Sequence, residues 1–450
     1  MKYKIVFYFP WQEISGGPNY LSTLANALAN DNNYEVYYID YPEGLTNNLL
    51  SKSINRINYE EPFSFPIQDE VTLITPIYCA SHIPLLHPNS KVLFVNWHNY
   101  CIQALLNVWR LDEKNLQQFL WMIYKKNAVF FLDRAHWMAQ NEWIKPKGSY
   151  CFLEQYVPGQ ISVRNNHIKR EKTTSEGINL AVLGRLSNDK IYAVLNLLQE
   201  IEKLPQELQK NIYVIGDGPG RSLLENYRIK SNLQLYLIGT ITGKELETFL
   251  IEQIDVLFGM GLSILEGGAV GLPSVIIPHG IKPFSTNKFT YLQESQGCML
   301  GWYSEQIEEL KIPWHPLQEI LEDIVIKNKK ILLGDRAYEY TKTIHRPDAY
   351  YLKQIIAKTN LLAKDFNRFA KQQGKLRLLG IPVGHLSTSF DETEKTIHFL
   401  GIENFLKFKR TATGEKIFLL GKEQKIFSAR KEKGKFRLFF LGKRIPLLKL

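Results

Sequence analysis

Three glycine-containing stretches of the sequence carry residues that could bind phosphate. They are Gly16–Gly17, Gly184–Arg185 with Lys190 close behind, and the turn GDGPG that opens at Gly216. Glycine lets a ligand approach the backbone closely, and the start of a helix offers unpaired N–H groups to an anion. Arginine adds forked donors and lysine a point charge, which together suit a diphosphate. Because each stretch follows an apolar run, we expect all three at strand ends, where open α/β sheets bind ligands.

The GDGPG turn at 216–220 has two interpretations. A dinucleotide-binding fold uses GxGxxG near the chain start, with an acidic residue about 20 positions later. Here the pattern is GxGxG in mid-chain, and Leu235–Ile238 stand where the acidic residue is expected. Pro219 suits the first position of a helix, where its missing N–H does no harm. The turn therefore either lines a nucleotide site or only reverses the chain.

A fourth stretch, FGMGLSILEGGAVGLP at 258–273, supplies a carboxylate. It places Glu266 on the first turn of a predicted helix that follows a strand. A carboxylate in that position can accept hydrogen bonds from two hydroxyl groups of a ribose. The sequence thus offers one group for a sugar beside several groups for phosphate.

The elements that must position these residues alternate between strand and helix. Unbroken apolar runs, typical of parallel strands covered on both faces, lie at 4–9, 35–40, 71–78, 91–97, 128–133, 150–158, 179–183, 212–215, 233–238, 255–258 and 273–277. Between the first two runs, apolar residues follow helical spacing at Leu21, Leu24, Ala25, Leu28 and Ala29. This alternation predicts an α/β protein with two tandem Rossmann-like domains, at 1–160 and 178–335. Polar residues at 161–177 predict a linker, and residues 336–373 are expected to be helical.

Residues 374–450 break this rhythm. The segments RLLG, HFLG, FLLG and FFLG end at Gly380, Gly401, Gly421 and Gly442, which predicts repeated β-hairpins. Residues 371–450 hold 18 Lys and Arg against 7 Asp and Glu, so they carry +11 and the first 370 residues carry −1. This basic appendage is a solvated face, a contact for anionic lipid or a lipid-linked acceptor, or a binder of acidic polysaccharide or a partner protein. No nucleic-acid motif accompanies the charge, which disfavours nucleic acid.

The composition excludes several other classes of protein. The 450 residues are 45% hydrophobic and 22% charged, as in globular proteins. The sequence has no run of about 18 apolar residues, so no transmembrane helix is predicted. The first residues do not have the pattern of a secretory signal. The four cysteines, at 79, 101, 151 and 298, form no CxxC pair, which predicts a reducing, cytoplasmic location without a zinc site.

Taken together, GGP, GRLSNDK, GDGPGRSLLE and FGMGLSILEG…GLPSV resemble, in order and spacing, the motifs of the GT-B-fold glycosyltransferases. The family in question is group 1, whose retaining, nucleotide-sugar-dependent enzymes serve bacterial polysaccharide and glycolipid biosynthesis. The resemblance covers about residues 1–350. It implies two Rossmann-like domains, a nucleotide-sugar co-substrate, no other cofactor, and an acceptor held by the N-terminal domain.

The resemblance also implies roles for particular residues. Gly16 and Gly17 would face the donor phosphates, Arg185 and Lys190 would neutralise the leaving diphosphate, and Glu266 would hold the ribose hydroxyls. Gly216 and the backbone N–H groups of Leu262, Ser263 and Ile264 would add further donor contacts. His98, in NWHNY, matches a histidine that the family often places near the sugar and is the expected catalytic residue. No DxD motif appears, so a metal is not expected.

One position departs from the family pattern. The family's first glutamate lies eight residues before the second, and Phe258 stands there in this chain. Three functions remain open. The first is a glycosyltransferase, peripheral at the inner face of the membrane, acting on a surface glycan or glycolipid. The second is a non-catalytic carbohydrate- or membrane-binding protein on the same scaffold, and the third is a nucleotide-sugar epimerase.

Overall fold

The computed structural model describes residues 2–12, 16–60, 63–109, 111–143, 152–164, 177–205, 207–230 and 232–370, together with the backbone of the strands within 375–449. These residues divide into two compact units. Unit 1 comprises 1–130, 139–153 and 353–450, and unit 2 comprises 131–138 and 154–352. The predicted domain boundaries remain predictions, and the middle of the predicted linker, 165–176, lies outside the described residues.

Unit 1 contains a six-stranded sheet of order β3-β2-β1-β4-β5-β6. Its strands are β1 (Tyr3–Tyr8), β2 (Tyr34–Asp40), β3 (Asn55–Asn58), β4 (Thr72–Pro76), β5 (Lys91–Asn96) and β6 (Val129–Phe131). The pairs from β3 through β5 are parallel. The predicted apolar face of the first helix is confirmed for Leu21, Leu24, Ala25 and Leu28, which are buried, whereas Ala29 at its end is half-buried. The helices that follow the strands are α1 (Gly16–Ala29), α2 (Cys101–Trp109) and α3 (Glu113–Lys125), and α4 (Arg134–Asn141) contains the division between the two units after residue 138.

Unit 2 contains a second six-stranded sheet, of order β12-β11-β10-β7-β8-β9. Its strands are β7 (Ile178–Leu183), β8 (Lys210–Ile215), β9 (Leu233–Gly239), β10 (Val256–Gly259), β11 (Ser274–Ile276) and the antiparallel edge β12 (Thr290–Tyr291). Its helices include α5 (Ile191–Glu202), α6 (Arg221–Glu225), α7 (Gly243–Gln253), α8 (Ile264–Val270), α9 (Leu317–Val325) and α10 (Lys330–Ile344). Two sheets built largely from parallel strands confirm the predicted α/β class with two Rossmann-like units.

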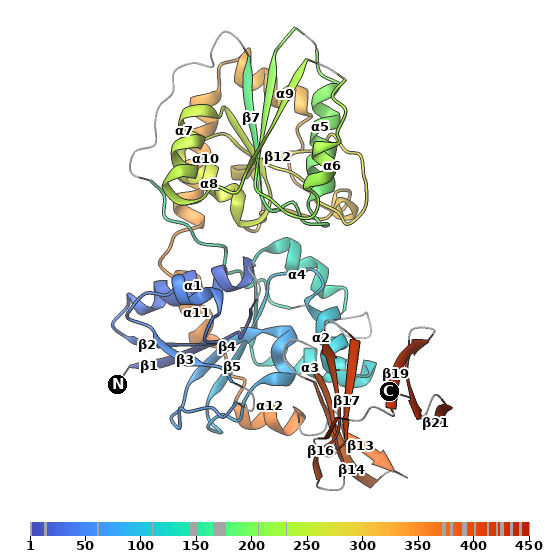
Figure 1. Ribbon diagram of the computed structural model, residues 1–450. Helices are drawn as coiled ribbons and strands as arrows, with labels where there is room; N and C mark the ends of the chain where they lie inside the picture. The colour runs from blue at the N-terminus through green and yellow to red at the C-terminus, as the bar shows by residue number, and fades with distance from the viewer. Residues whose placement is uncertain are drawn as a thin grey trace. The chain divides into compact units, whose positions relative to one another are not determined.

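The two faces of the second sheet bury alternate residues of the same strands. Leu180 and Val182 of β7 join one apolar cluster with residues of α5, α6 and α9. Ala181 and Leu183 join the other cluster, with residues of α7 and α8. Figure 1 shows these two groups of helices on opposite faces of the sheet. In open α/β sheets, ligands bind in the crevice outside the carboxyl ends of the strands.

Two further segments can be compared with the predictions. The predicted strand at 150–158 is wrong, because its described residues form only an isolated bridge from Tyr156 to Phe131. Phe152 and Val157 are nevertheless buried, so their apolar character reflects packing beside a single bridge to β6. The helical region predicted at 336–373 contains the end of α10, then α11 (Tyr350–Lys358) and α12 (Ala363–Ala370).

The C-terminal appendage is described only by its backbone strands. In chain order they are β13 (Lys375–Leu378), β14 (Ile381–Thr388), β15 (Glu394–Phe399), β16 (Ile402–Thr411), β17 (Gly414–Leu419), β18 (Lys422–Glu423), β19 (Phe427–Glu432), β20 (Lys435–Phe440) and β21 (Lys443–Lys449). Neighbouring strands pair antiparallel in two sheets, β13 to β18 and β19 to β21. The repeat glycines Gly380, Gly401, Gly421 and Gly442 lie outside the described residues.

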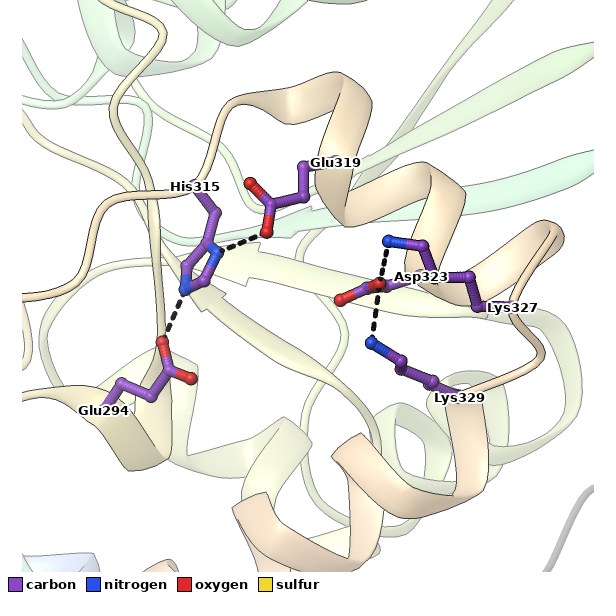
Figure 2. A network of polar contacts seen from close by, with 6 residues as sticks. All are labelled: Glu294, His315, Glu319, Asp323, Lys327 and Lys329. Atoms are coloured by element: carbon purple, nitrogen blue, oxygen red, sulfur yellow. Dashed lines mark hydrogen bonds and ion pairs between the residues drawn. The ribbon is translucent and has the colours of Figure 1, made fainter.

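Polar side chains form hydrogen bonds and ion pairs around α9 in unit 2 (Figure 2). Each ring nitrogen of His315 is hydrogen-bonded to a carboxylate. Oε2 of Glu294 lies 2.6 Å from Nε2, and Oε1 of Glu319 lies 3.2 Å from Nδ1. Burial lowers the pKa of His315, but the hydrogen bonds to the two carboxylates outweigh burial and raise it. When both ring nitrogens are protonated, the imidazolium can donate to both carboxylates and tie the segment before α9 to the sheet edge.

Candidate functional site

The carboxyl ends of three strands of unit 2 meet through glycine. The Gly216 N–H donates to the Gly239 carbonyl at 2.7 Å, and the Gly184 N–H donates to the Ile215 carbonyl at 3.0 Å. Gly216 has φ of +134°, and a Cβ there would lie 2.0 Å from the Gly184 carbonyl oxygen. Glycine at 216 is therefore required for close packing of β8 on the end of β7.

The rest of the GDGPG turn holds the segment that carries Arg185. Leu186 donates its N–H to the Asp217 carbonyl at 2.9 Å and accepts from the Gly220 N–H at 2.8 Å. A Cβ on Gly218 would lie 2.7 Å from the Leu186 carbonyl oxygen. The turn thus fixes the backbone of the residue after Arg185 by two hydrogen bonds, while the Arg185 side chain is exposed. This geometry favours a scaffolding role for the turn and places Gly216 beside the segment that carries the predicted donor-binding cation.

Lys190 lies at the start of α5, close to the turn that follows β10. Its Nζ is 3.9 Å from the position that a Cβ on Gly261 would occupy. Burial lowers the pKa of Lys190; the charge of Asp189 opposes this shift, and that of Arg185 adds to it. A half-buried ammonium next to a second cation, at a strand end, is well placed to attract an anion.

The turn between β10 and α8 is fixed by hydrogen bonds. The Ser263 hydroxyl lies 2.8 Å from the Leu183 carbonyl and 2.9 Å from the Met260 carbonyl. The Ile264 N–H is directed at the carbonyls of Gly261 and Leu262 within the turn itself. Of the three residues predicted here, Ser263 therefore docks the turn on β7, and Ile264 donates its N–H inside the turn.

Glu266 lies on the first turn of α8 and is half-buried. None of the residues that the structure describes donates a hydrogen bond to its carboxylate. Burial raises the pKa of Glu266; the charge of Arg164 lowers it, and that of Glu247 raises it further. A partly desolvated carboxylate without donors is costly for folding alone, and such groups cluster at functional sites.

Phe258, at the place of the family's first glutamate, is a core residue. Its side chain is fully buried on β10, and its ring centroid lies 6.4 Å from that of Phe289. Phe258 lies within β10, which extends to Gly259. Its side chain belongs to the apolar cluster that also contains residues of α5. No carboxylate is available at this position for a sugar.

In unit 1, the predicted glycine pair begins α1. Gly16 is exposed, and a Cβ added there would meet nothing within 4 Å. Gly17 instead packs on an aromatic ring, since a Cβ would lie 2.9 Å from Cζ2 of Trp97. The two glycines thus differ: Gly16 leaves the backbone open to a ligand, and Gly17 allows the helix to approach Trp97.

His98 follows β5 and is exposed. Its Nδ1 accepts the Tyr100 N–H at 3.2 Å. The loop is held by the buried Gln140, whose amide donates to the carbonyls of His98 and Asn99 at 3.1 and 2.6 Å and accepts from the Ile102 N–H. Gln140 is a positioning residue that sequence reasoning missed, because a single glutamine in an aromatic-rich stretch carries no pattern.

The predicted site residues therefore fall into two groups. Unit 2 gathers Arg185, Lys190, Gly216, Leu262, Ser263, Ile264 and Glu266 around the ends of β7, β8 and β10. Unit 1 holds Gly16, Gly17 and His98 at the ends of β1 and β5. The described residues contain no group of three His, Cys, Asp or Glu side chains arranged to hold a metal ion. Among the described helices, none has the length and apolar character needed to cross a membrane.

Comparisons with known proteins give matches by structure alone. No family model and no curated protein matches the sequence. The crystal structure of Anabaena Alr3699/HepE in complex with UDP-glucose is 12% identical, with 79% of this chain and 98% of that chain covered at a TM-score of 0.47. The lipopolysaccharide outer core galactosyltransferase WaaB is 11% identical, with 79% and 99% covered at 0.47. A glycosyltransferase from Rickettsia africae is 13% identical, with 82% and 99% covered at 0.48.

Proposed function

We propose that the protein is a GT-B-type glycosyltransferase that moves a sugar from a nucleotide-sugar donor to a surface-glycan or glycolipid acceptor. The observation that carries the proposal is Glu266, a half-buried carboxylate for which the described residues supply no hydrogen-bond donor. Ribose hydroxyls would supply two donors and would compensate the desolvation of the carboxylate. The order of the four glycine-rich motifs along the chain supports the same assignment.

The proposed chemistry is departure of a nucleoside diphosphate, with retention at the anomeric carbon and without a metal. Negative charge develops on the leaving diphosphate, and Arg185 and Lys190 are the cations proposed to stabilise it. Gly16 and Gly17 are proposed to face the donor phosphates, with Gly216 and the 262–264 turn in support. His98 is proposed to act near the transferred sugar, and the basic stretch 374–450 is proposed to contact an anionic membrane surface in the cytoplasm.

The test is a thermal-shift screen with UDP, GDP, ADP, CMP and their common sugar conjugates, with and without EDTA. A ligand at 100 times its dissociation constant stabilises by about 2.7 kcal/mol, which moves Tm by a few degrees. We expect one nucleotide class to give this shift regardless of EDTA, and Glu266→Gln to abolish it. Glu245→Gln, an exposed residue of α7, is the matched control and should keep the shift. A shift that survives in Glu266→Gln would overturn the assignment of Glu266.

A second candidate is a non-catalytic binding protein on the same scaffold, and the buried Phe258 favours it because a sugar-contacting carboxylate is missing. The two candidates differ in donor consumption. The transferase releases nucleoside diphosphate when a glycolipid acceptor is supplied, and the binding protein does not.

A further inference from the structure

An aspartate and a histidine that follow β6 form a hydrogen-bonded pair in unit 2. Asp133 lies two residues after the strand, and His136 lies in the first turn of α4. The Asp133 side chain is only 1% exposed, and its Oδ1 lies 2.6 Å from Nδ1 of His136. A carboxylate only accepts hydrogen bonds, so this contact assigns a proton to Nδ1. In the neutral ring, Nε2 therefore carries the lone pair.

Two backbone donors fix the orientation of the Asp133 carboxylate. The His136 N–H donates to Oδ1 at 3.0 Å, and the Leu300 N–H donates to Oδ2 at 3.4 Å. The first of these bonds is an ordinary N-cap of α4. A cap needs only the backbone N–H, so the contact with the imidazole and the bond from Leu300, 167 positions away, go beyond capping. The carboxylate is thus held at both oxygens and in turn orients the ring.

The second ring nitrogen of His136 is available to a ligand. The side chain is 17% exposed, and none of the described residues forms a hydrogen bond with Nε2. The neighbouring Arg134 is engaged elsewhere, because its Nη1 donates to Oε1 of Gln296 at 3.0 Å and its N–H donates to the Gly297 carbonyl at 2.9 Å. His315 in the same unit differs, since a carboxylate is bound to each of its ring nitrogens.

The loop that contains Leu300 also binds the turn before α8. The Leu300 carbonyl accepts from the Gly261 N–H at 2.6 Å. Gly261 opens the turn whose next residues, 262–264, are proposed to support the donor phosphates. A Cβ on Gly301 would lie 3.3 Å from Cβ of Met260, so the loop also packs against the residue after β10. One buried residue, Leu300, therefore connects the Asp133 carboxylate with this turn.

We propose that His136 is the general base of the transferase reaction and that Asp133 is the residue that positions it. This inference rests on the proposed function. Retention means that the acceptor oxygen bonds to the anomeric carbon on the face from which the diphosphate departs. The base must then lie beside the groups that bind the diphosphate, and the connection through Leu300 supports this location for His136.

In the proposed step, a proton moves from the acceptor hydroxyl to the imidazole. Nε2 of His136 accepts this proton while the acceptor oxygen bonds to the anomeric carbon. The bond from that carbon to the diphosphate oxygen breaks, and its electron pair leaves with the nucleoside diphosphate. The Asp133 carboxylate stabilises the imidazolium that forms, and the proton then passes from Nε2 to solvent. His98 of unit 1 keeps its separate proposed role near the transferred sugar.

The experiment measures release of nucleoside diphosphate from UDP-glucose, GDP-mannose and ADP-glucose, with water or octyl glucoside as the acceptor. In His136→Ala, kcat should fall by about 100- to 10,000-fold with little change in KM for the donor, because only the transition state uses the base. Imidazole added to the buffer should restore part of the rate, since a small base can replace the missing side chain. A merely structural role of His136 predicts no such rescue.

Asp133→Asn separates the charge of the carboxylate from its role as a helix cap. Asparagine caps helices as well as aspartate does, so the variant should keep a cooperative melting curve. The amide carries no charge to stabilise the imidazolium, so kcat should fall by at least about 10-fold. His315→Asn is the matched control, because both nitrogens of that ring are already bound, and its kcat should equal that of the wild type.

The outcomes distinguish this inference from the proposed function. A wild-type protein that shows no thermal shift with any of the three donors overturns the proposed function. A protein that binds a donor but releases no nucleoside diphosphate with either acceptor overturns the role of His136 and favours the non-catalytic candidate. If turnover is seen and His136→Ala retains the wild-type kcat, only the role of His136 is overturned. If Asp133→Asn does not fold, the His136→Ala rate and its rescue by imidazole decide.

Discussion

A Cβ atom on Gly216 would come within 2.0 Å of the Gly184 carbonyl oxygen, so these two glycines touch backbone to backbone. The contact joins the ends of β7 and β8 where the predicted phosphate-binding segment begins. It also explains why a glycine-rich turn stands here without the spacing of a dinucleotide-binding loop. Gly216 is required by the fold before any ligand is considered.

The first prediction follows from this contact. Gly216→Ala should lower the free energy of unfolding by more than about 1 kcal/mol. The new Cβ would clash with the Gly184 backbone, and alanine would have to adopt the positive φ that glycine has here. Gly16→Ala is the matched variant at an open position and should change stability little. Urea unfolding of both proteins checks the contrast. Equal stabilities would show that the strand ends separate readily to admit a side chain.

The second prediction concerns Phe258. Phe258→Glu introduces a glutamate where the glycosyltransferases that the sequence resembles have one, but it places a charge among fully buried apolar residues. We expect a loss of about 4 kcal/mol or more, against about 1 kcal/mol for Phe258→Leu. Chemical denaturation gives both values. A Phe258→Glu protein as stable as Phe258→Leu, with increased donor turnover, would contradict this assignment of position 258 to the core.

The third prediction concerns Lys190. Lys190→Ala should weaken binding of a nucleoside diphosphate by about 10- to 100-fold, because a charge-assisted contact to phosphate is lost. The exposed Lys311 is the control, and Lys311→Ala should leave the dissociation constant unchanged. Titration calorimetry at two salt concentrations measures the effect. If the two variants bind equally well, Lys190 does not contact the diphosphate.

The fourth prediction uses the network of Figure 2. The pKa of His315 is raised in the folded protein by Glu294 and Glu319, even though burial lowers it. The resulting stability is fully present below the unfolded pKa of about 6.5 and is lost as pH rises through the folded value. Because the carboxylates are partly exposed, we expect about 1 kcal/mol. His315→Asn should remove this component, so the wild-type advantage measured by urea unfolding should shrink as the pH rises above about 6.5.

How much could be predicted from sequence depends on how local the signal is. The runs that became β1, β7 and β8 are unbroken and apolar because both faces of these central strands are covered, so their sequence predicts them well. The edge strand β3 has the sequence NRIN and is mostly exposed, so it shows no apolar pattern and was missed. The run at 150–158 has the composition of a strand, but its described residues are largely packed in the core and pair with β6 at one bridge only.

Residues of the candidate site were likewise predictable only where their signal is local in the sequence. Arg185, Lys190 and Glu266 each follow a strand in a recognisable motif, and topology brings them to one edge of a sheet. Arg164 could not be found in this way, because it lies in a polar stretch that predicts a linker. Its ion pair with Glu247 of α7 joins residues 83 positions apart. Sequence patterns describe neighbours along the chain, and such contacts lie beyond them.

The discontinuity of unit 1 has a consequence for the order in which the nascent chain can fold. Strand β5 and the residue before it bind residues from far downstream: the Leu361 carbonyl accepts from the Val92 N–H at 2.9 Å, and the Ala363 N–H donates to the Ser90 carbonyl at 2.7 Å. Phe366 also packs against Phe94, with ring centroids 5.9 Å apart. During synthesis on the ribosome, the first half of the chain must therefore wait with part of its core uncovered until the whole second sheet has emerged. A messenger cut short after about codon 350 would yield an intact second unit and a first unit that chaperones and proteases recognise as unfinished.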